Sequence, residues 1–364
     1  LFILVIGAAT DYSLLLVARF REELRLVEDA WTATWRAVRA SIEPILASGG
    51  TVIAGLLCLL LSDLRSNSTL GPVAAIGIAF AMLAALTFLP AVLYAFGRTA
   101  FWPRRVTFEE APVIVPSVPG VPVAGAAIAG APRGWWARLA DCIAVRPRTV
   151  WLVTTAVLAL GTLGVGQLRA DGVAQSQLIL GGSEALEGQV ELAEHFPGGS
   201  GSPVYVLAPA DRLQAAADVL LAHPGIARVA VTSADAVSGS VGMSADGARG
   251  APTVVDGRVL LQGTLQAAAD SDAALETVAD LRSEFARALP GRVFVGGATA
   301  TAIDTAAASI RDRTLIIPVV LVVITLILMA LLRSVVAPVL LVLTTVLSFG
   351  TTMGVAALVF NHLL

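Results

Sequence analysis

Charged residues are scarce in this sequence, and their scarcity excludes an ordinary soluble protein. Asp, Glu, Lys and Arg make up 14% of the 364 residues, whereas apolar residues make up 56%. A soluble domain carries roughly a quarter charged residues. Together with a mean hydropathy of +0.81, this composition predicts an integral membrane protein that carries an aqueous portion.

Cysteine, histidine and lysine are also rare or absent, and each absence removes a class of site. The two cysteines, Cys58 and Cys142, are too few for a disulfide framework. The three histidines, His195, His223 and His362, lack the spacing of metal ligands, so we expect no metal site and no cofactor. All 24 basic residues are Arg and the net charge is −3, and we expect no nucleic-acid partner.

The sequence also lacks the motifs of an enzyme. It has no convincing Ser-His-Asp set and no Gly-rich phosphate loop with a Lys. The Gly-Gly-Ser-Gly segment at 198–201 lacks the strand-loop-helix context of a phosphate loop and is predicted to be a flexible turn. We therefore expect no enzymatic activity.

One carboxylate interrupts the first apolar run. Residues 1–18 can cross a bilayer core of roughly 30 Å at about 1.5 Å per residue, and Asp11 carries their only formal charge. Arg19 marks the aqueous end, which places Asp11 about 12 Å inside. A charge at this depth costs at least about 2.5 kcal/mol and marks a functional site by default. A carboxyl group that can be neutral or ionised is what a proton relay needs, and Gly7 on the same face leaves room for a partner side chain. The alternative is an acid that is neutralised by a neighbouring helix for packing alone.

Apolar runs along the chain predict a membrane α-helical bundle of about six transmembrane helices and one aqueous domain. The predicted segments are a first span over 1–18, an amphipathic cytoplasmic interfacial helix over 19–43, two spans within 44–97, a cytoplasmic Pro-, Gly- and Ala-rich linker over 98–148, a fourth span within 149–168, an extracytoplasmic domain over 169–312, and two spans within 313–364.

The interfacial helix is predicted from charges and apolar residues that alternate at helical spacing over 19–43. Trp31 and Trp35 are four residues apart and share a face, which favours a helix that lies on the membrane surface with its Arg side chains toward headgroups. The alternative, a solvated charged helix, does not account for the paired Trp.

The distribution of arginine predicts the orientation. Residues 19–43 and 98–148 contain five and seven Arg, whereas the loop over 63–69 contains one. The positive-inside rule places both Arg-rich segments in the cytoplasm. Residues 169–312 are then extracytoplasmic, and the protein is expected in the cytoplasmic (inner) membrane.

The extracytoplasmic domain is predicted to be an α/β domain. Its pattern is β-α-β followed by β-α-β, which indicates a ferredoxin-like split βαβ sandwich. Asp211 is the predicted N-cap of the first helix. The predicted elements are strands over 204–208, 227–232, 258–267 and 292–295, with helices over 211–222 and 270–289.

Five motifs together resemble the MMPL family, the large mycobacterial-type membrane transporters of the resistance-nodulation-division superfamily. The motifs are GAATDYSLLLVARFREEL at 7–24, HFP at 195–197, GGATA at 296–300, RDRTLIIP at 311–318 and RSVVAP at 333–338. The resemblance implies a protein of two pseudo-repeats, each a helix, a large porter-type outer domain and five further helices. This chain resembles helices four to nine with the second outer domain, and we expect it to be an internal fragment.

In the family that this sequence resembles, an Asp-Tyr pair on helix four faces a second such pair on helix ten, and the pairs relay protons. Asp11 and Tyr12 match the first pair, and the second is expected beyond residue 364. Ser13 stands where relatives often have Cys, and no consequence is drawn from this. The hydroxyl of Tyr12 is expected to reach an acid on the partner helix.

The resemblance implies a secondary transporter, driven by the proton-motive force, that exports lipids or other hydrophobic compounds. Its expected partners are that lipid or hydrophobic small-molecule substrate, protons, membrane lipids and the missing second Asp-Tyr helix. The alternative is a non-transporting membrane sensor or scaffold of the cell envelope with the same fold. Asp11 distinguishes the two, because a pure scaffold has no need for an acid near the bilayer midplane.

The predicted orientation can be tested with a maleimide that does not cross membranes. In intact cells that express the full-length protein, this reagent should label a Ser238→Cys variant and spare Cys142, because only the first position is predicted to be external. Cells that have been permeabilised control for the reactivity of Cys142. Labelling of Cys142 in sealed cells would overturn the orientation.

Overall fold

The chain forms two compact units in the computed structural model, which describes residues 2–103, 106–108, 135–168 and 184–362. The helical unit comprises Leu1–Arg169 and Asp312–Leu364, and the α/β unit comprises Ala170–Arg311. More than half of the predicted linker over 98–148 lies outside the described residues, and near its end the structure has helix α5 (Trp135–Val145).

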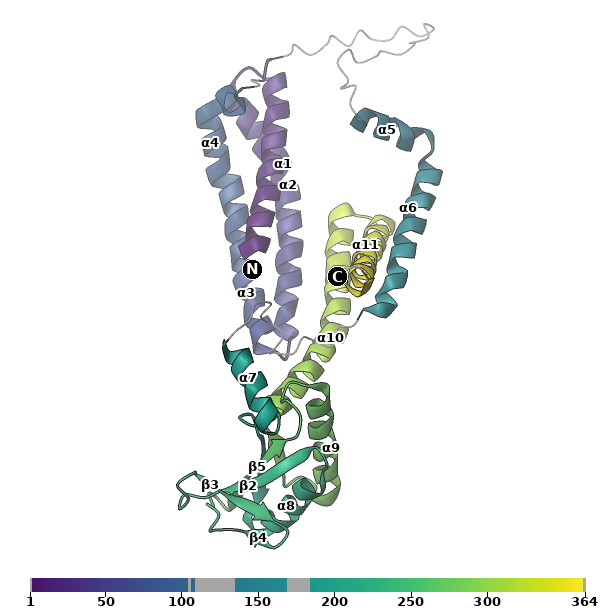
Figure 1. Cartoon of the computed structure of the whole chain (residues 1–364). Coiled ribbons are helices and arrows are strands. Elements are labelled where there is room, and N and C mark those ends of the chain that lie inside the picture. The colour runs from purple at the N-terminus through teal and green to yellow at the C-terminus, as the bar shows by residue number, and fades with distance from the viewer. Residues whose placement is uncertain (1, 104–105, 109–134, 169–183, 363–364) are drawn as a thin grey trace, which may run out of the picture. The chain divides into compact units, whose positions relative to one another are not determined.

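Six helices of the described part are long and apolar enough to cross a membrane, which confirms the predicted number (Figure 1). They are α1 (Phe2–Leu26); α2 (Ala30–Leu57) with a 3-10 extension (Cys58–Leu61); α3 (Arg65–Leu83), which continues through a π-helical segment (Ala84–Phe88) into α4 (Leu89–Phe96) and a 3-10 turn (Gly97–Phe101); α6 (Pro147–Thr162) with a 3-10 extension (Leu163–Gln167); α10 (Ala298–Leu332); and α11 (Val336–His362).

The structure does not contain the single helix predicted over 19–43. The first helix continues to Leu26, and α2 begins at Ala30 and runs on into the second span. Asp29 is the cause of the break, because its carboxylate accepts hydrogen bonds from the backbone N–H groups of Trp31 and Thr32 at 3.4 and 2.8 Å and caps the new helix. The Thr32 hydroxyl donates to the same carboxylate and holds the pKa of Asp29 below its ordinary value. Trp31 is exposed, and its contact with lipid headgroups stays a prediction.

One face of α1 packs against α2, α3 and α4, and no described residue covers the opposite face. The buried positions recur every four residues, at Tyr12, Leu16, Phe20 and Leu24, and residues four apart lie one above the other on a helix. Their contacts form two clusters with Ala33, Ala37, Ile45, Ile78, Met82, Ala85, Leu93 and Val106.

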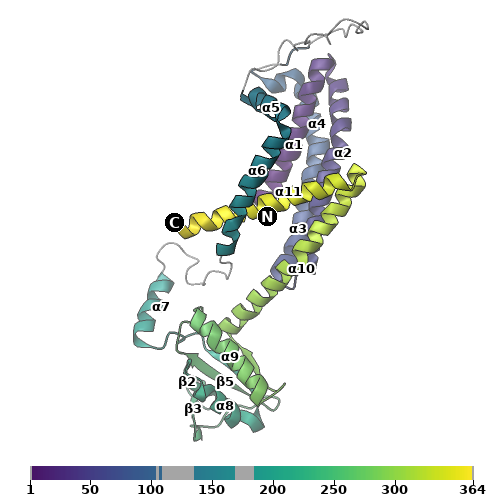
Figure 2. The ribbon, with the colours of Figure 1, turned by 90° about the vertical axis from the view of Figure 1, so that its right-hand side faces the viewer.

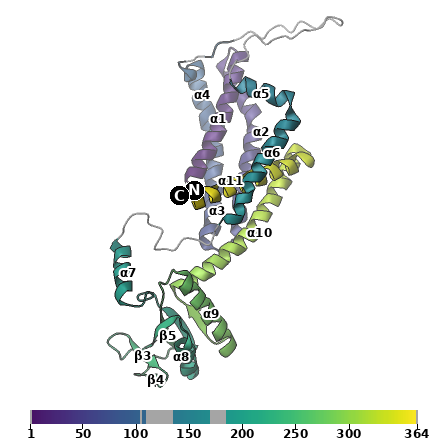
Figure 3. The same ribbon diagram turned by 45° about the vertical axis from the view of Figure 1, so that its right-hand side comes forward.

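Helices α6 and α11 cross at very short range (Figures 2 and 3). A Cβ added at Gly354 would overlap the carbonyl oxygen of Gly161, and one added at Gly164 would overlap the carbonyl oxygen of Gly354. The Thr351 hydroxyl donates to the carbonyl of Leu158 at 2.8 Å across the same crossing. Small residues that let two backbones approach are typical of helix pairs in membranes.

The α/β unit is a six-stranded antiparallel sheet in the order β4-β3-β2-β5-β1-β6. Helices α8 and α9 cover one face and form the core with the inward residues of the strands, which alternate along β5. The elements are α7 (Glu184–His195), β1 (Val204–Pro209), a 3-10 turn (Ala210–Arg212), α8 (Leu213–Ala222), β2 (Ile226–Thr232), β3 (Ser240–Ser244), β4 (Gly247–Ala248), β5 (Arg258–Leu265), α9 (Asp272–Ala288) and β6 (Phe294–Gly296).

The predicted strands and helices of this unit are present, and two details differ. The predicted N-cap, Asp211, lies inside a 3-10 turn, and α8 begins after Arg212 without a side-chain cap. Strands β3 and β4 were not expected, because β3 reads Ser-Val-Gly-Met-Ser and has low intrinsic strand propensity. It forms by pairing with the edge of β2, where Ala230 lies opposite Gly242.

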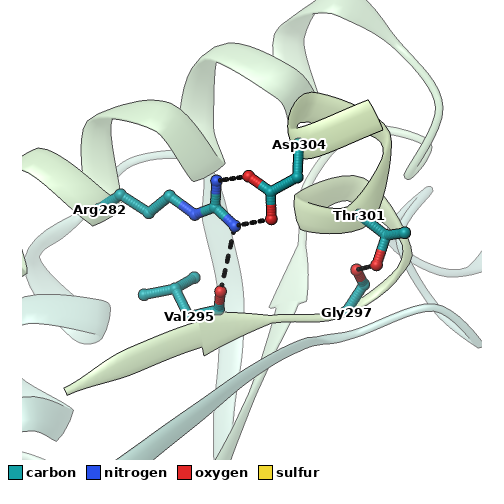
Figure 4. Close-up of polar contacts among 5 residues, drawn as sticks. All are labelled: Arg282, Val295, Gly297, Thr301 and Asp304. Carbon is teal, nitrogen blue, oxygen red and sulfur yellow. Dashed lines mark hydrogen bonds and ion pairs between the residues drawn. The ribbon is translucent and has the colours of Figure 1, made fainter. Parts of the chain in front are cut away.

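The start of α10 is anchored to α9 and β6 (Figure 4). Arg282 donates to both carboxylate oxygens of Asp304, at 2.6 and 2.9 Å, and to the carbonyl of Val295 at 3.3 Å. The Thr301 hydroxyl donates to the carbonyl of Gly297 at 3.0 Å. A bidentate Arg-carboxylate pair fixes the relative orientation of the two helices.

We expect the segment Ala170–Arg311 to fold by itself, because its sheet, helices and core are contained within it. Circular dichroism of the purified segment should show mixed α/β structure. Phe285→Ala should lower its free energy of unfolding by about 3–5 kcal/mol in urea titration, since Phe285 is buried in the core. The control is Leu221→Ala at an exposed position. A random-coil spectrum of the unmodified segment would contradict this prediction.

Candidate functional site

Asp11 lies on the uncovered face of α1. Asp11 is exposed, and no hydrogen bond or ion pair joins its side chain to the described residues. A Cβ added at Gly7, one turn earlier, would meet nothing within 4 Å. The face around Asp11 is therefore open to another chain segment or to lipid.

A shallow depression lies on another face of α1, and Asp11 is not among its lining residues. It is lined by Ile6, Ala9, Thr10, Ser13, Leu14 and Val17. The hydroxyls in this lining do not offer free donors, because Thr10 donates to the carbonyl of Ile6 at 2.8 Å and Ser13 donates to that of Ala9 at 2.7 Å. Asp11 is thus the one charged group in an apolar stretch that runs from Phe2 to Ala18.

Tyr12 points into the bundle, away from the face that carries Asp11. It is 5% exposed and packs with Ile45, Ile78 and Met82. Its hydroxyl is buried without a hydrogen-bond partner among the described residues. Leaving such a group unsatisfied costs about 1–3 kcal/mol. The adjacent residues therefore occupy different environments, since successive side chains on a helix are about 100° apart.

Sequence reasoning did not identify a second unsatisfied hydroxyl in the helical unit. The Oγ of Ser41 on α2 is buried and has no partner among the described residues. Ser41 is one turn before Ile45, which contacts Tyr12. The sequence signal for this hydroxyl was a Ser at a position of α2 that faces the bundle. This signal is weak, because a Ser hydroxyl in a helix often bonds to a carbonyl of its own helix.

Two buried carboxylates of the helical unit also escaped the sequence analysis. Glu23 is 6% exposed, and its Oε1 lies 3.2 Å from Nη2 of Arg19, which also binds Glu22. The i, i+4 spacing of Arg19 and Glu23 is the sequence signal from which this ion pair could have been predicted. Asp312 is likewise 6% exposed and accepts hydrogen bonds from the turn between α2 and α3.

The chemistry available at this site is proton exchange. A carboxyl group can take up and release a proton, and a phenol can donate a hydrogen bond to it. Within the described residues there is no group of three or more His, Cys, Asp or Glu side chains that could hold a metal ion. Asp11 and Tyr12 are thus the titratable side chains that the first spanning helix presents at membrane depth.

The fold and the site define a class: a multi-pass membrane protein with an α/β domain between its fourth and fifth spanning helices. The model of the MMPL family matches residues 1–150 and 182–364. The chain therefore belongs to the MMPL family.

Relatives with known names agree with this assignment. The chain is 44% identical over 360 residues to the putative membrane protein SCO0839 of Streptomyces coelicolor, covering 99% of this chain and 47% of that protein. It is 42% identical to the putative membrane protein ActII-3 of the same organism, covering 99% and 45%. It is 28% identical to the apo-petrobactin exporter of Bacillus anthracis, covering 99% and 47%. The chain spans about half the length of these curated relatives.

The buried hydroxyl of Tyr12 leads to a prediction about the stability of the protein. Tyr12→Phe in the full-length protein should leave the melting temperature in detergent within a few degrees of the unmodified protein, because it removes no hydrogen bond seen in this chain. Tyr12→Ala should lower the free energy of unfolding by about 3–5 kcal/mol, since it opens a cavity beside Ile78 and Met82. A large loss of stability with Phe would show that the hydroxyl has a partner.

Proposed function

We propose that the whole protein is a secondary transporter that uses the proton-motive force to export lipids or other hydrophobic compounds across the cytoplasmic membrane. The observation that carries this proposal is Asp11, whose carboxylate lies on the open face of an apolar helix and has no partner among the described residues. Membership of the MMPL family supports export, as does the name of the apo-petrobactin exporter to which the chain is similar.

Asp11 is the proposed proton carrier. An acid at membrane depth is unstable as an isolated charge, so it is held neutral or faces a partner that stabilises the charge. Alternation between these states lets proton uptake and release favour different arrangements of α1. The membrane potential contributes about 2.3 kcal/mol per charge per 100 mV, which is enough to shift conformations that differ by a few kcal/mol.

Tyr12 is the proposed second member of the relay. Its hydroxyl is buried and lacks a partner among the described residues, and we propose that a rearrangement of α1 brings it to an acid or a water molecule. The partner we propose is the second Asp-Tyr helix of the full-length protein. Gly7 keeps the approach to Asp11 open to that helix.

The α/β unit is proposed to be a ferredoxin-like porter domain outside the cytoplasm. Its strand order β2-β5-β1-β6, with α8 after β1 and α9 after β5, supports a split βαβ arrangement. The excess of Arg in the segments around α1, α2 and α5 supports the orientation. In this proposal the domain contacts the hydrophobic substrate once it has left the membrane.

Asp11→Asn tests the proposal most simply. The amide is nearly isosteric with the acid and keeps its hydrogen-bonding capacity, but it does not exchange a proton at physiological pH. We expect the full-length variant to express, to elute as the unmodified protein does on size exclusion, and to lose transport in proteoliposomes under an imposed pH gradient. Tyr12→Phe should cause a comparable loss if its hydroxyl belongs to the relay.

The packing alternative predicts the opposite result. If Asp11 only packs against a neighbour, Asn should be tolerated or even stabilising, because it removes a group whose burial is costly. The matched control is Ser13→Ala, which removes a hydroxyl that bonds only to its own helix. Unmodified transport rates from a well-folded Asp11→Asn protein would contradict proton coupling through this residue.

A further inference from the structure

Asp312 on α10 is a buried carboxylate that the relay does not use. Its Oδ2 accepts a hydrogen bond from the hydroxyl of Ser62, and its Oδ1 accepts one from the backbone N–H of Asp63 at 3.0 Å. Both partners belong to the turn between α2 and α3. Hydrogen bonds to a charged acceptor are among the stronger ones in proteins, and a buried carboxylate needs them. The contact therefore ties α10 to this turn.

The same contact completes the start of α3. The N-cap residue of α3 is Leu64, whose side chain makes no capping bond. Instead, the Ser62 hydroxyl accepts a hydrogen bond from the N–H of Leu64 at 3.1 Å while it donates to Asp312. A chain of two hydrogen bonds thus joins the Asp312 carboxylate to the N-cap residue of α3.

Helix α3 leads from this turn to the surroundings of Tyr12. A Cβ at Gly71 would lie 2.5 Å from the carbonyl oxygen of Leu56, and a Cβ at Gly77 would lie 2.7 Å from Cγ2 of Val5 on α1. Further along, Ile78 and Met82 pack on Tyr12. Because these approaches leave little free space, a displacement of α3 must be shared with α1 and α2.

At its other end, α10 is part of the α/β unit. Ala300 is buried in the core of that unit, and Asp304 forms the bidentate pair with Arg282 shown in Figure 4. Asp304 and Asp312 lie on one uninterrupted helix, about 12 Å apart along its axis. One helix thus carries a carboxylate anchor in each of the two units.

We propose that Asp312 is a positioning residue for transport. Its carboxylate holds α10 to the turn before α3, so that the rearrangement caused by proton exchange at Asp11 reaches the α/β unit through α10. This inference rests on the proposed function and adds the residue through which the proton site and the α/β unit are linked. Loss of the Asp312 carboxylate should uncouple the movement of α2 and α3 from the movement of the α/β unit. The proton site at Asp11 remains in place.

Distance measurements between pairs of spin labels test this link in the full-length protein, with native cysteines replaced by Ser. One pair, Leu46→Cys with Phe80→Cys, reports on α2 and α3 beside Tyr12; both positions are exposed. The other pair, Ser66→Cys with Ser238→Cys, reports on the start of α3 and on the α/β unit. Each pair is measured in proteoliposomes with and without a proton gradient, and transport is measured in parallel.

In the unmodified protein, the gradient should shift both distances. In Asp312→Ala, the Leu46–Phe80 shift should remain and the Ser66–Ser238 shift should be lost. Transport should fall by at least about tenfold, the factor that corresponds to one of the two hydrogen bonds that the carboxylate accepts. Asp312→Asn keeps one acceptor oxygen and should rescue part of both losses. Ser309→Ala, on the same helix, should behave as the unmodified protein because its hydroxyl bonds only to its own helix.

The link is overturned if Asp312→Ala keeps both shifts and normal transport. If that variant does not fold, Ser62→Ala, which keeps the Asp63 bond, should show the same separation to a smaller degree, and unchanged behaviour of Ser62→Ala overturns the proposal.

Failure of the proposed function looks different, because Asp11→Asn then transports normally. In that case the contact of Asp312 is tested by the Ser66–Ser238 distance distribution measured without a gradient. This distribution should broaden in Asp312→Ala, and an unchanged width contradicts the contact.

Discussion

The cost of removing a carboxylate from water is the constraint that organises the helical unit. Among the described residues, its two buried carboxylates are both paired: Glu23 with Arg19, and Asp312 with Ser62 and the backbone of Asp63. Asp11, which the sequence predicts to lie at membrane depth, has no such partner among the described residues. Paired acids hold a fold together, whereas an acid left open can change its charge. This contrast is the physical basis for proposing Asp11 as the proton carrier.

The two faces of α1 have different roles. Tyr12, Leu16 and Phe20 lie on the buried face and fix α1 against its neighbours. The other face offers Asp11 beside the open position of Gly7. The buried face therefore holds α1 in place in a way that leaves Asp11 available to a partner. The hydroxyl of Tyr12, on the buried face, has no partner among the described residues.

Properties that depend on local sequence could be predicted. The spanning helices follow from the length and apolarity of each run, and the strands of the α/β unit follow from alternation along segments such as β5. The separate helix over 19–43 was wrong because helical periodicity continues through Asp29, whose capping bonds start a new helix. Helical spacing gave the angle between Asp11 and Tyr12 but not which face the other helices would cover. The role of Asp312 had no local signal, since its partner Ser62 is 250 residues away in the sequence.

The central proposal is that the full-length protein couples the export of its substrate to proton movement in the opposite direction. The most direct test is to load proteoliposomes that contain the full-length protein with substrate, impose no pH gradient, and follow internal pH with a trapped dye as the substrate gradient relaxes. The account predicts proton movement opposite to the substrate, and its disappearance in Asp11→Asn. Relaxation of the substrate gradient with no change in internal pH, at rates that Asp11→Asn does not alter, would contradict it.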